Sequence, residues 1–77
     1  MKLQREKKHV EAGDSRRGTV VMSISGSLTE VRAIEKILDA NWDNTMCEGI
    51  EEDQVTIFYS VPSNFVADFR NEYKLNK

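Results

Sequence analysis

The sequence predicts an α+β domain: a two-layer sandwich in which a three- or four-stranded, mainly antiparallel sheet carries two helices on one face. Two observations predict this class. Segments rich in β-branched residues, with alternating apolar and polar positions, are typical of strands, and they are interleaved with two segments whose apolar residues recur at helical spacing. The 77 residues fit one small domain. The predicted order is (β)-β-α-β-β-α, with residues 18–77 forming the domain.

The N-terminal segment, residues 1–17, allows two interpretations. It is polar and holds six basic and three acidic residues, a net charge of +3, whereas the rest of the chain carries −5. Gly13, Asp14 and Ser15 are a turn signal, because glycine tolerates positive φ and the two polar side chains bond to nearby backbone. The segment is therefore either a basic arm or an edge strand, over about residues 3–11, that turns back onto the next strand.

A strand and a helix follow this segment. Residues 19–25 are rich in β-branched side chains and alternate in polarity, as in a strand with one buried face. Ser27 and Glu30 match a capping box, in which each side chain satisfies a free backbone N–H of the first helical turn. We expect the helix to run to about Asn41, with an apolar stripe at positions 28, 31, 34, 37, 38 and 40.

The C-terminal half predicts a hairpin and a second helix. Residues 44–50 and 54–61 are strands joined by an acidic turn, and Pro62 ends the second strand. Ser63 is the expected N-cap of a helix that ends near Tyr73 or Lys74. Its apolar stripe is Phe65, Val66, Phe69 and Tyr73. This order overlaps a split βαβ pattern but lacks the last strand of that pattern.

The two faces of the predicted sheet differ in chemistry. We expect both helices to cover the face that carries Val20, Met22, Ile24, Val55, Ile57 and Tyr59. The opposite face then shows Val21, Ser23, Ser25, Thr45, Cys47, Thr56, Phe58 and Ser60. That face is small and mildly polar with one prominent aromatic side chain, so it suits either water or an interface with a partner.

Composition predicts a soluble, cytoplasmic protein. Cys47 is the single cysteine, so no internal disulfide can form, whereas a secreted chain of this size usually carries several. The N-terminus lacks the apolar run of a signal peptide. The longest apolar runs are far shorter than the roughly 20 residues that cross a bilayer, so we expect no membrane contact.

The sequence predicts no enzyme, no cofactor and no metal site. His9 has no orienting partner nearby, and Cys47, in a strand without basic neighbours, is expected to be buried and inert. The acidic residues between Asp43 and Asp53 lack the spacing of a calcium loop. Ser25-Gly26-Ser27 has too few glycines and no lysine for a phosphate-binding loop, so we interpret it as a helix cap.

Two functions stay open at this point. The first is a non-catalytic regulatory module that binds a protein partner and modulates it, either as a monomer or as a homodimer. Aromatic side chains and the acidic turn are its expected contacts: Trp42, Phe58, Glu51, Glu52 and Asp53. The alternative is a nucleic-acid-binding module that contacts phosphates through the basic segment. Its expected contacts are Arg5, Lys7, Lys8, Arg16 and Arg17.

Overall fold

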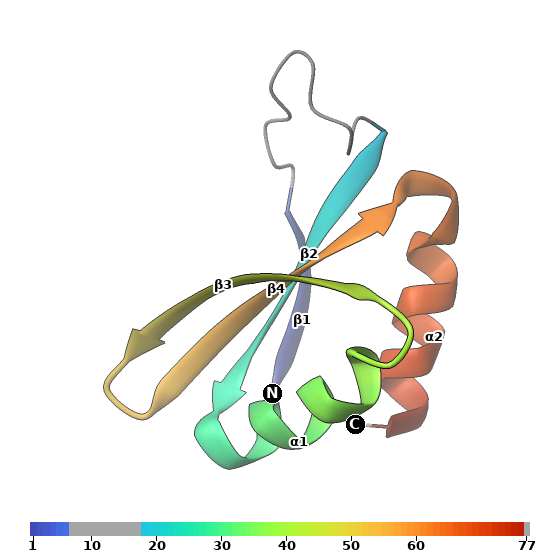
Figure 1. The fold of residues 1–77 in the computed structure, drawn as a ribbon. Helices are drawn as coiled ribbons and strands as arrows, with labels where there is room; N and C mark the ends of the chain where they lie inside the picture. The colour runs from blue at the N-terminus through green and yellow to red at the C-terminus, as the bar shows by residue number, and fades with distance from the viewer. Residues whose placement is uncertain (7–17, 77) are drawn as a thin grey trace.

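The computed structural model describes residues 1–6 and 18–76 (Figure 1). It shows an α+β fold with one antiparallel sheet and two α-helices in the order β-β-α-β-β-α, which confirms the predicted class. The elements are β1 (Lys2–Glu6), β2 (Thr19–Ser27), α1 (Leu28–Leu38), β3 (Asp43–Glu51), β4 (Gln54–Pro62), the short 3-10 helix η1 (Ser63–Phe65) and α2 (Val66–Asn76).

The four strands lie in the order β1-β2-β4-β3, and each neighbouring pair is antiparallel. Because β4 pairs with both β2 and β3, the latter two run in the same direction with β4 between them. This is the split βαβ arrangement, with α1 as the connection. The edge beside β2 is closed by β1, which comes from the N-terminus of the chain.

The core fills the space between one face of the sheet and the two helices. Side chains of β2 and β4 that alternate along each strand supply the sheet half of this core. Phe69 and Tyr73 from α2 and three residues of α1 supply the other half. The buried apolar residues are Met22, Ile24, Val31, Ile34, Leu38, Val55, Ile57, Tyr59, Val61, Phe69 and Tyr73. Both helices therefore cover the same face, as expected.

Helix α1 begins at the predicted capping box. The Ser27 hydroxyl accepts from the Glu30 N–H at 3.4 Å and donates to the Glu30 carboxylate at 2.9 Å. The helix ends at Leu38, earlier than expected, because the next hydrogen bonds tighten to three-residue spacing: the Ala40 N–H donates to the Ile37 carbonyl at 3.4 Å and the Asn41 N–H to the Leu38 carbonyl at 3.1 Å. The buried stripe is also narrower than predicted: Leu28 and Ile37 are exposed.

The expected N-cap at Ser63 is wrong. Ser63 opens the 3-10 helix η1, and its N–H donates to the Gly18 carbonyl at 3.0 Å, so the chain turns toward the start of β2 before α2 begins. Phe65, predicted as part of the apolar stripe of this helix, lies in this turn and is 44% exposed, so its place in the stripe is wrong. An N-cap at Ser63 would start the helix at Asn64, so tertiary packing has displaced the start of α2 by two residues, to Val66.

Strand β3 is irregular where a regular strand was expected. Its register against β4 shifts between Asn44 and Glu48, and Met46 has a left-handed φ of 65°. The Asn44 side-chain oxygen accepts from the Met46 N–H at 2.8 Å and holds this bulge. Cys47 lies within the bulge and is exposed, so the expectation of a buried thiol is wrong.

Candidate functional site

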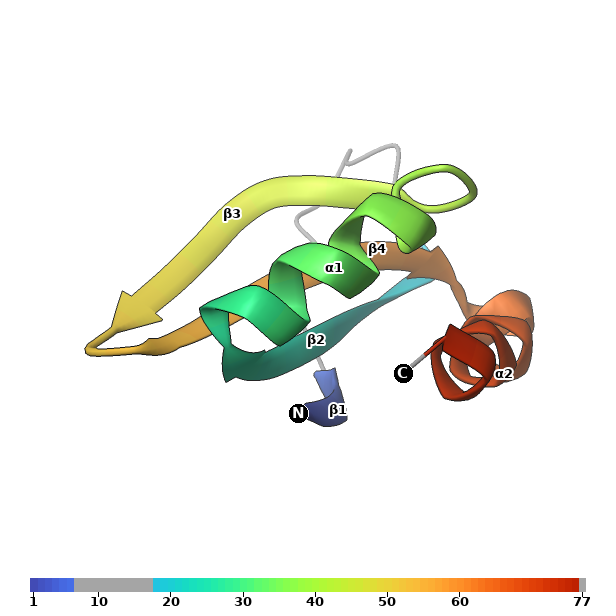
Figure 2. The same cartoon turned by 90° about the horizontal axis from the view of Figure 1, so that it is seen from below.

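The face of the sheet that the helices leave uncovered is the candidate site; we call it the open face. Paired residues of antiparallel strands point to the same face, so the register defines rows across the sheet. The open-face rows are Lys2, Ser25, Thr56 and Gly49; then Gln4, Ser23 and Phe58; then Val21, Ser60 and Asp43. The hairpin of β3 and β4 carries this face away from α2 (Figure 2).

Phe58 occupies the middle of the open face and is part-buried. Small side chains surround it: Ser23 is its partner in the same row, and Ser60 follows two positions along β4. The Phe58 carbonyl accepts from the Thr45 hydroxyl at 3.0 Å, which fixes β3 beside it across the bulge. Ser23 and Ser60 are themselves buried, at 4% and 5% exposure, so the part-buried Phe58 ring is the main feature of this region of the face.

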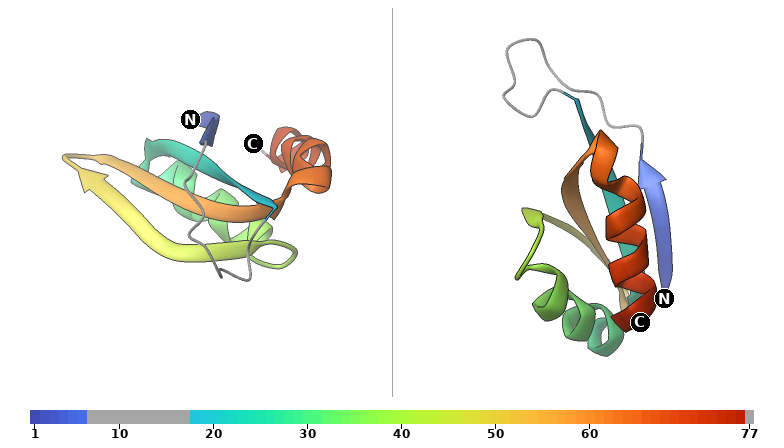
Figure 3. Two further views of the ribbon diagram at one scale, coloured as in Figure 1. Left: turned by 90° about the horizontal axis from the view of Figure 1, so that it is seen from above. Right: turned by 90° about the vertical axis from the view of Figure 1, so that its right-hand side faces the viewer.

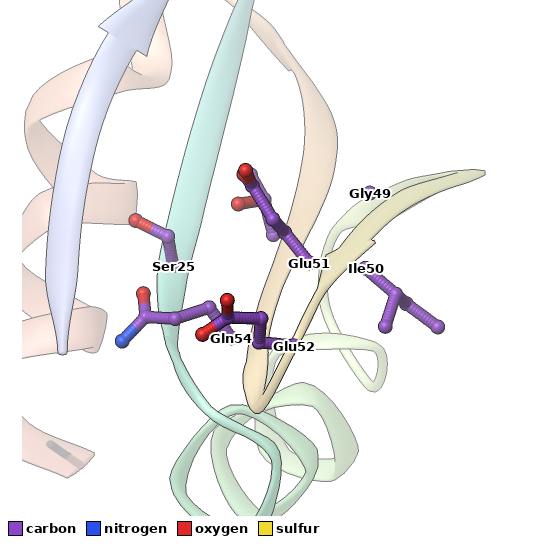
Figure 4. Close-up of a pocket in the computed structure, with 7 residues that line it drawn as sticks. Ser25, Gly49, Ile50, Glu51, Glu52 and Gln54 are labelled. Carbon is purple, nitrogen blue, oxygen red and sulfur yellow. The ribbon is translucent and has the colours of Figure 1, made fainter.

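A hollow of about 540 Å³ lies on the open face near the hairpin tip, lined by Ser25, Gly49, Ile50, Glu51, Glu52, Gln54 and Thr56. Figure 4 shows the side chains of Ser25, Glu51, Glu52 and Gln54 on one side of the hairpin, with Ile50 pointing away from them. Gly49 has no atom within 4 Å of the position that a Cβ would take, so it leaves the hollow open. Two carboxylates and several neutral polar groups suit this hollow to a cationic side chain.

A second hollow of about 350 Å³ lies at the other end of β4, lined by Asn41, Trp42, Asp43, Ser60, Pro62 and Phe65. Its walls are more apolar, with two aromatic side chains, and Asp43 supplies its carboxylate. Gln54 and Thr56 line the first hollow and Ser60 and Pro62 line the second, so the two hollows flank Phe58 on the same strand.

Trp42 both packs against the core and lines a surface hollow. Its ring meets Phe69 of α2 edge-on, with centroids 5.3 Å apart and an angle of 83° between the planes. It also lines the second hollow. Its indole Nε1 is buried and has no hydrogen-bond partner among the described residues. A substitution at Trp42 would therefore change stability together with the hollow.

Four of the five expected protein contacts lie in three places. Glu51 and Glu52 lie together in the first hollow, Phe58 lies at the centre of the open face, and Trp42 lies at the second hollow. Asp53 is exposed in the hairpin turn but does not line the first hollow. Sequence reasoning missed Phe65 and Pro62, since their joint position depends on η1, which no local signal predicts.

A polar network ties α1 to β3 on the opposite side of the sheet. Arg32 donates to Glu48 Oε2 at 3.1 Å and to Glu35 Oε1 at 2.9 Å, and its Nη1 lies 2.9 Å from Glu48 Oε1 in an ion pair. The Asn44 amide donates to Glu35 at 3.0 Å and to Asp39 at 3.1 Å. The Arg32–Glu35 pair follows from helical spacing, whereas the link to Glu48 depends on the β3 bulge and could not be predicted.

The pKa shifts of this network follow from its hydrogen bonds. The bond from Arg32 holds the pKa of Glu48 below its ordinary value of 4.5, and the same bond raises the pKa of Arg32. Burial, followed by the 2.6 Å hydrogen bond that its hydroxyl donates to Asp39, raises the pKa of Tyr59. These groups hold β3 against α1 and lie on the face opposite Phe58.

The described part of the chain does not form a metal site at the acidic turn, and it includes little of the basic segment. Among residues 1–6 and 18–76, His, Cys, Asp and Glu side chains do not gather in groups of three or more that could hold a metal ion. Arg5 is exposed in β1, in register with Met22 and so away from the open face. Lys7, Lys8, His9, Arg16 and Arg17 lie outside the described residues.

Comparisons with known proteins found no matching family, no similar curated protein and no similar solved structure. Within the described ranges, neither helix has the length and apolar character that crossing a bilayer requires.

Proposed function

We propose that the chain is a non-catalytic interaction module that binds another protein through the open face and thereby modulates it. One observation carries the proposal: both helices pack on one side of the sheet, and the other side presents Phe58 between two hollows, the first with two carboxylates and the second with one. An aromatic ring at the centre of a surface, with polar groups around it, is the usual composition of a protein-binding hot spot.

The chemistry of the two hollows favours a partner with basic side chains. Glu51 and Glu52 belong to the first hollow and Asp43 to the second. Carboxylates at the rim of an interface steer a basic partner and exclude an acidic one, even where each pair adds little affinity. The aromatic walls of the second hollow, Trp42 and Phe65, also attract cations through their π faces.

The test is capture of a partner from native lysate by three versions of the protein: wild type, Phe58→Lys and Leu75→Lys. Leu75 is 85% exposed on α2, so its substitution adds the same charge at an apolar surface position away from the open face. We expect the wild type and Leu75→Lys to retain one protein at constant stoichiometry and Phe58→Lys to lose it. Circular dichroism of each variant confirms that the fold is intact.

Half of each lysate is treated with nuclease, which tests the nucleic-acid alternative directly. A partner that survives nuclease and needs Phe58 supports the proposal. Recovery of the same partner by Phe58→Lys would contradict it, and a partner that disappears with nuclease would favour the basic segment as the site.

A further inference from the structure

We propose that the outer edge of β1 pairs with the same edge of a second copy of this chain, so that the two sheets join into one continuous antiparallel sheet. The two copies are related by a two-fold axis that is perpendicular to the sheet and passes beside Gln4. This dimer uses a surface other than the open face, so it goes beyond the proposed function. Three features of β1 support it: its position in the sheet, the direction of its backbone groups and the order of its charges.

Among the described residues, β1 is an edge strand that pairs with β2 on one side and with no strand on the other. In the right-hand view of Figure 3, β1 forms the margin of the sheet, and α2 lies in front of the sheet rather than beyond that margin. The five residues of β1, Lys2–Glu6, pair with β2 in unbroken register. A regular edge of this kind can accept a further strand through backbone hydrogen bonds.

The backbone groups of Leu3 and Arg5 point away from β2, toward this edge. The residues on either side of the two-residue turn of the β3–β4 hairpin form a hydrogen-bonded pair. Because the backbone groups of successive residues alternate in direction, the registers across β4 and β2 place Gln4 in a pair that is hydrogen-bonded to β2. The Ser23 hydroxyl donates to the Gln4 carbonyl at 3.4 Å, in agreement with that direction. The neighbours of Gln4 on both sides therefore have backbone donors and acceptors to offer a second copy.

The charges of β1 are arranged symmetrically about Gln4. An antiparallel pairing centred on Gln4 opposes Lys2 of one copy with Glu6 of the other, and the two-fold axis repeats this pair. The two Gln4 residues meet at the axis, where side-chain amides can both donate and accept. These are pairs of the non-hydrogen-bonded type, in which the Cα atoms are only about 4.5 Å apart and the side chains are closest. Opposite charges therefore meet at both ends of the interface.

Leu3 of one copy and Arg5 of the other form the hydrogen-bonded pairs of the same register. Each pair exchanges two N–H···O bonds, and the axis produces two such pairs. Leu3 packs partly buried against the core, whereas Arg5 is exposed. The aliphatic stem of Arg5 would therefore cover Leu3 of the other copy while the guanidinium group stays in water.

Other registers and the other edge of the sheet are less complementary. An axis at Leu3 opposes Lys2 with Gln4 instead of with a carboxylate, and an axis at Arg5 opposes the two arginines. The opposite edge, β3, holds three acidic residues and no basic residue, and the bulge interrupts its register. Like charges therefore repel a second copy at β3, whereas the charges of β1 attract one.

The pairing leaves the open faces of both copies on the same side of the joined sheet. One partner could then contact two copies of the proposed binding surface at once. The interface itself is short and exposed to solvent, so we expect a weak dimer, with Kd on the order of 100 µM at low salt.

Sedimentation equilibrium of charge-swap variants tests this dimer. The wild type is expected to approach twice the chain mass of 8.8 kDa at high concentration. Lys2→Glu and Glu6→Lys should each raise Kd by about tenfold, because each opposes like charges twice per dimer. The double variant K2E/E6K should return Kd to within about threefold of wild type. The matched controls, Lys36→Glu on α1 and Asp53→Lys in the hairpin turn, change exposed residues away from β1 and should leave Kd unchanged.

A proline at position 5 tests the backbone bonds. Arg5→Pro removes an N–H that points away from β2, so the pairing of β1 with β2 should persist while Kd rises by about tenfold or more. Arg5→Ala retains this N–H and should retain most of the affinity. Circular dichroism of each variant confirms that the fold is intact.

A wild type that stays monomeric up to millimolar concentration would overturn this dimer. A dimer whose Kd ignores both the charge swaps and Arg5→Pro would also overturn it, because the copies would then meet at another surface. Neither outcome affects the proposed function, which depends on the loss of a captured partner through Phe58→Lys. That variant should leave the Kd of the dimer unchanged, so the two proposals fail separately.

Discussion

Trp42 and Phe58 are the two aromatic side chains whose roles differ most at the scale of single residues. Trp42 packs edge-on against Phe69 in the core, whereas Phe58 stands on the open face. We expect Trp42→Ala to lower the free energy of unfolding by about 3 kcal/mol and Phe58→Ala by about 1 kcal/mol or less. Urea denaturation at low protein concentration measures both. Equal losses would mean that Phe58 belongs to the core.

The ion pair between Arg32 and Glu48 predicts a dependence of stability on pH. The hydrogen bond from Arg32 lowers the pKa of Glu48 below 4.5 in the folded state. A carboxyl group whose folded pKa is depressed stabilises the fold above its unfolded pKa, and this stabilisation is lost as the pH falls through the folded value. Glu48→Gln should therefore be less stable than wild type at pH 7, with a difference that shrinks as the pH falls below 4.5.

Thermal unfolding of Glu48→Gln and wild type across this pH range checks the prediction. Asp53→Asn is a matched control, because it removes one carboxylate from the exposed hairpin turn without touching the network. A constant difference between wild type and Glu48→Gln at every pH would show that the side-chain charge of Glu48 plays no part.

At the residue scale, the sequence predicted those interactions whose two partners are close together in the chain. The Ser27–Glu30 capping box was predicted because both partners lie within one helical turn. The packing role of Trp42 was not predicted, since Phe69 lies on α2 and only tertiary packing brings the two rings together. The prediction that Cys47 is buried was wrong, because the bulge changes the alternation of side chains along β3 at that point.

At the scale of elements, alanine substitutions at two glycines of the sheet should change the stability of the fold by different amounts. A Cβ at Gly26 would lie 3.0 Å from the Met1 Cα, so Gly26→Ala requires Met1, which directly precedes β1, to move by a few tenths of an ångström. We expect a loss of about 1–3 kcal/mol, typical of overpacking. Gly49→Ala meets open space and should change stability by less than about 0.5 kcal/mol. Chemical denaturation at a concentration too low for self-association compares them, and equal effects would refute the close approach of β1.

The turn of the β3–β4 hairpin predicts a stabilising substitution. Glu52 has a φ of 55°, whereas Asp53, the other central residue, has no positive φ, which is the pattern of a type II′ turn. The first central position of that turn favours glycine. Glu52→Gly should therefore raise the free energy of unfolding by about 1 kcal/mol.

Asp53→Gly is the matched control for this turn. Its backbone does not need the freedom of glycine, so it should bring no gain and a small entropic loss. A stabilisation by Asp53→Gly equal to that by Glu52→Gly would show that the strain is not located at Glu52.

Element boundaries followed the sequence where a local signal defined them. The hairpin turn and the start of α1 lie where turn residues and the cap predicted. The α2 helix does not start directly after Ser63, because the Ser63 N–H donates a hydrogen bond to the Gly18 carbonyl, 45 positions earlier in the chain. The bulge of β3 escaped prediction for a similar reason: Glu48 is held by Arg32 from a neighbouring helix.

The whole molecule shows what periodicity can and cannot predict. The alternation of β2 and β4 and the helical spacing of Phe69 and Tyr73 predicted two layers with one covered face. The order of the strands in the sheet could not be predicted in this way, because the hydrophobic pattern of a strand does not identify its neighbours. The contribution of β1 to the sheet was therefore left open between an arm and an edge strand.

The edge position of β1 has a consequence for the connectivity of the chain. The start of β1 and the end of α2 lie at the same end of the molecule in both views of Figure 3. A short linker between them, with the chain opened at Gly18, gives a circular permutant whose strands and helices run β-α-β-β-α-β. We expect this permutant to fold into the same sheet, with a circular dichroism spectrum like that of the native chain. The split βαβ pattern that lacks its last strand in the native order would then be complete, because β1 becomes that last strand without a change in its place beside β2.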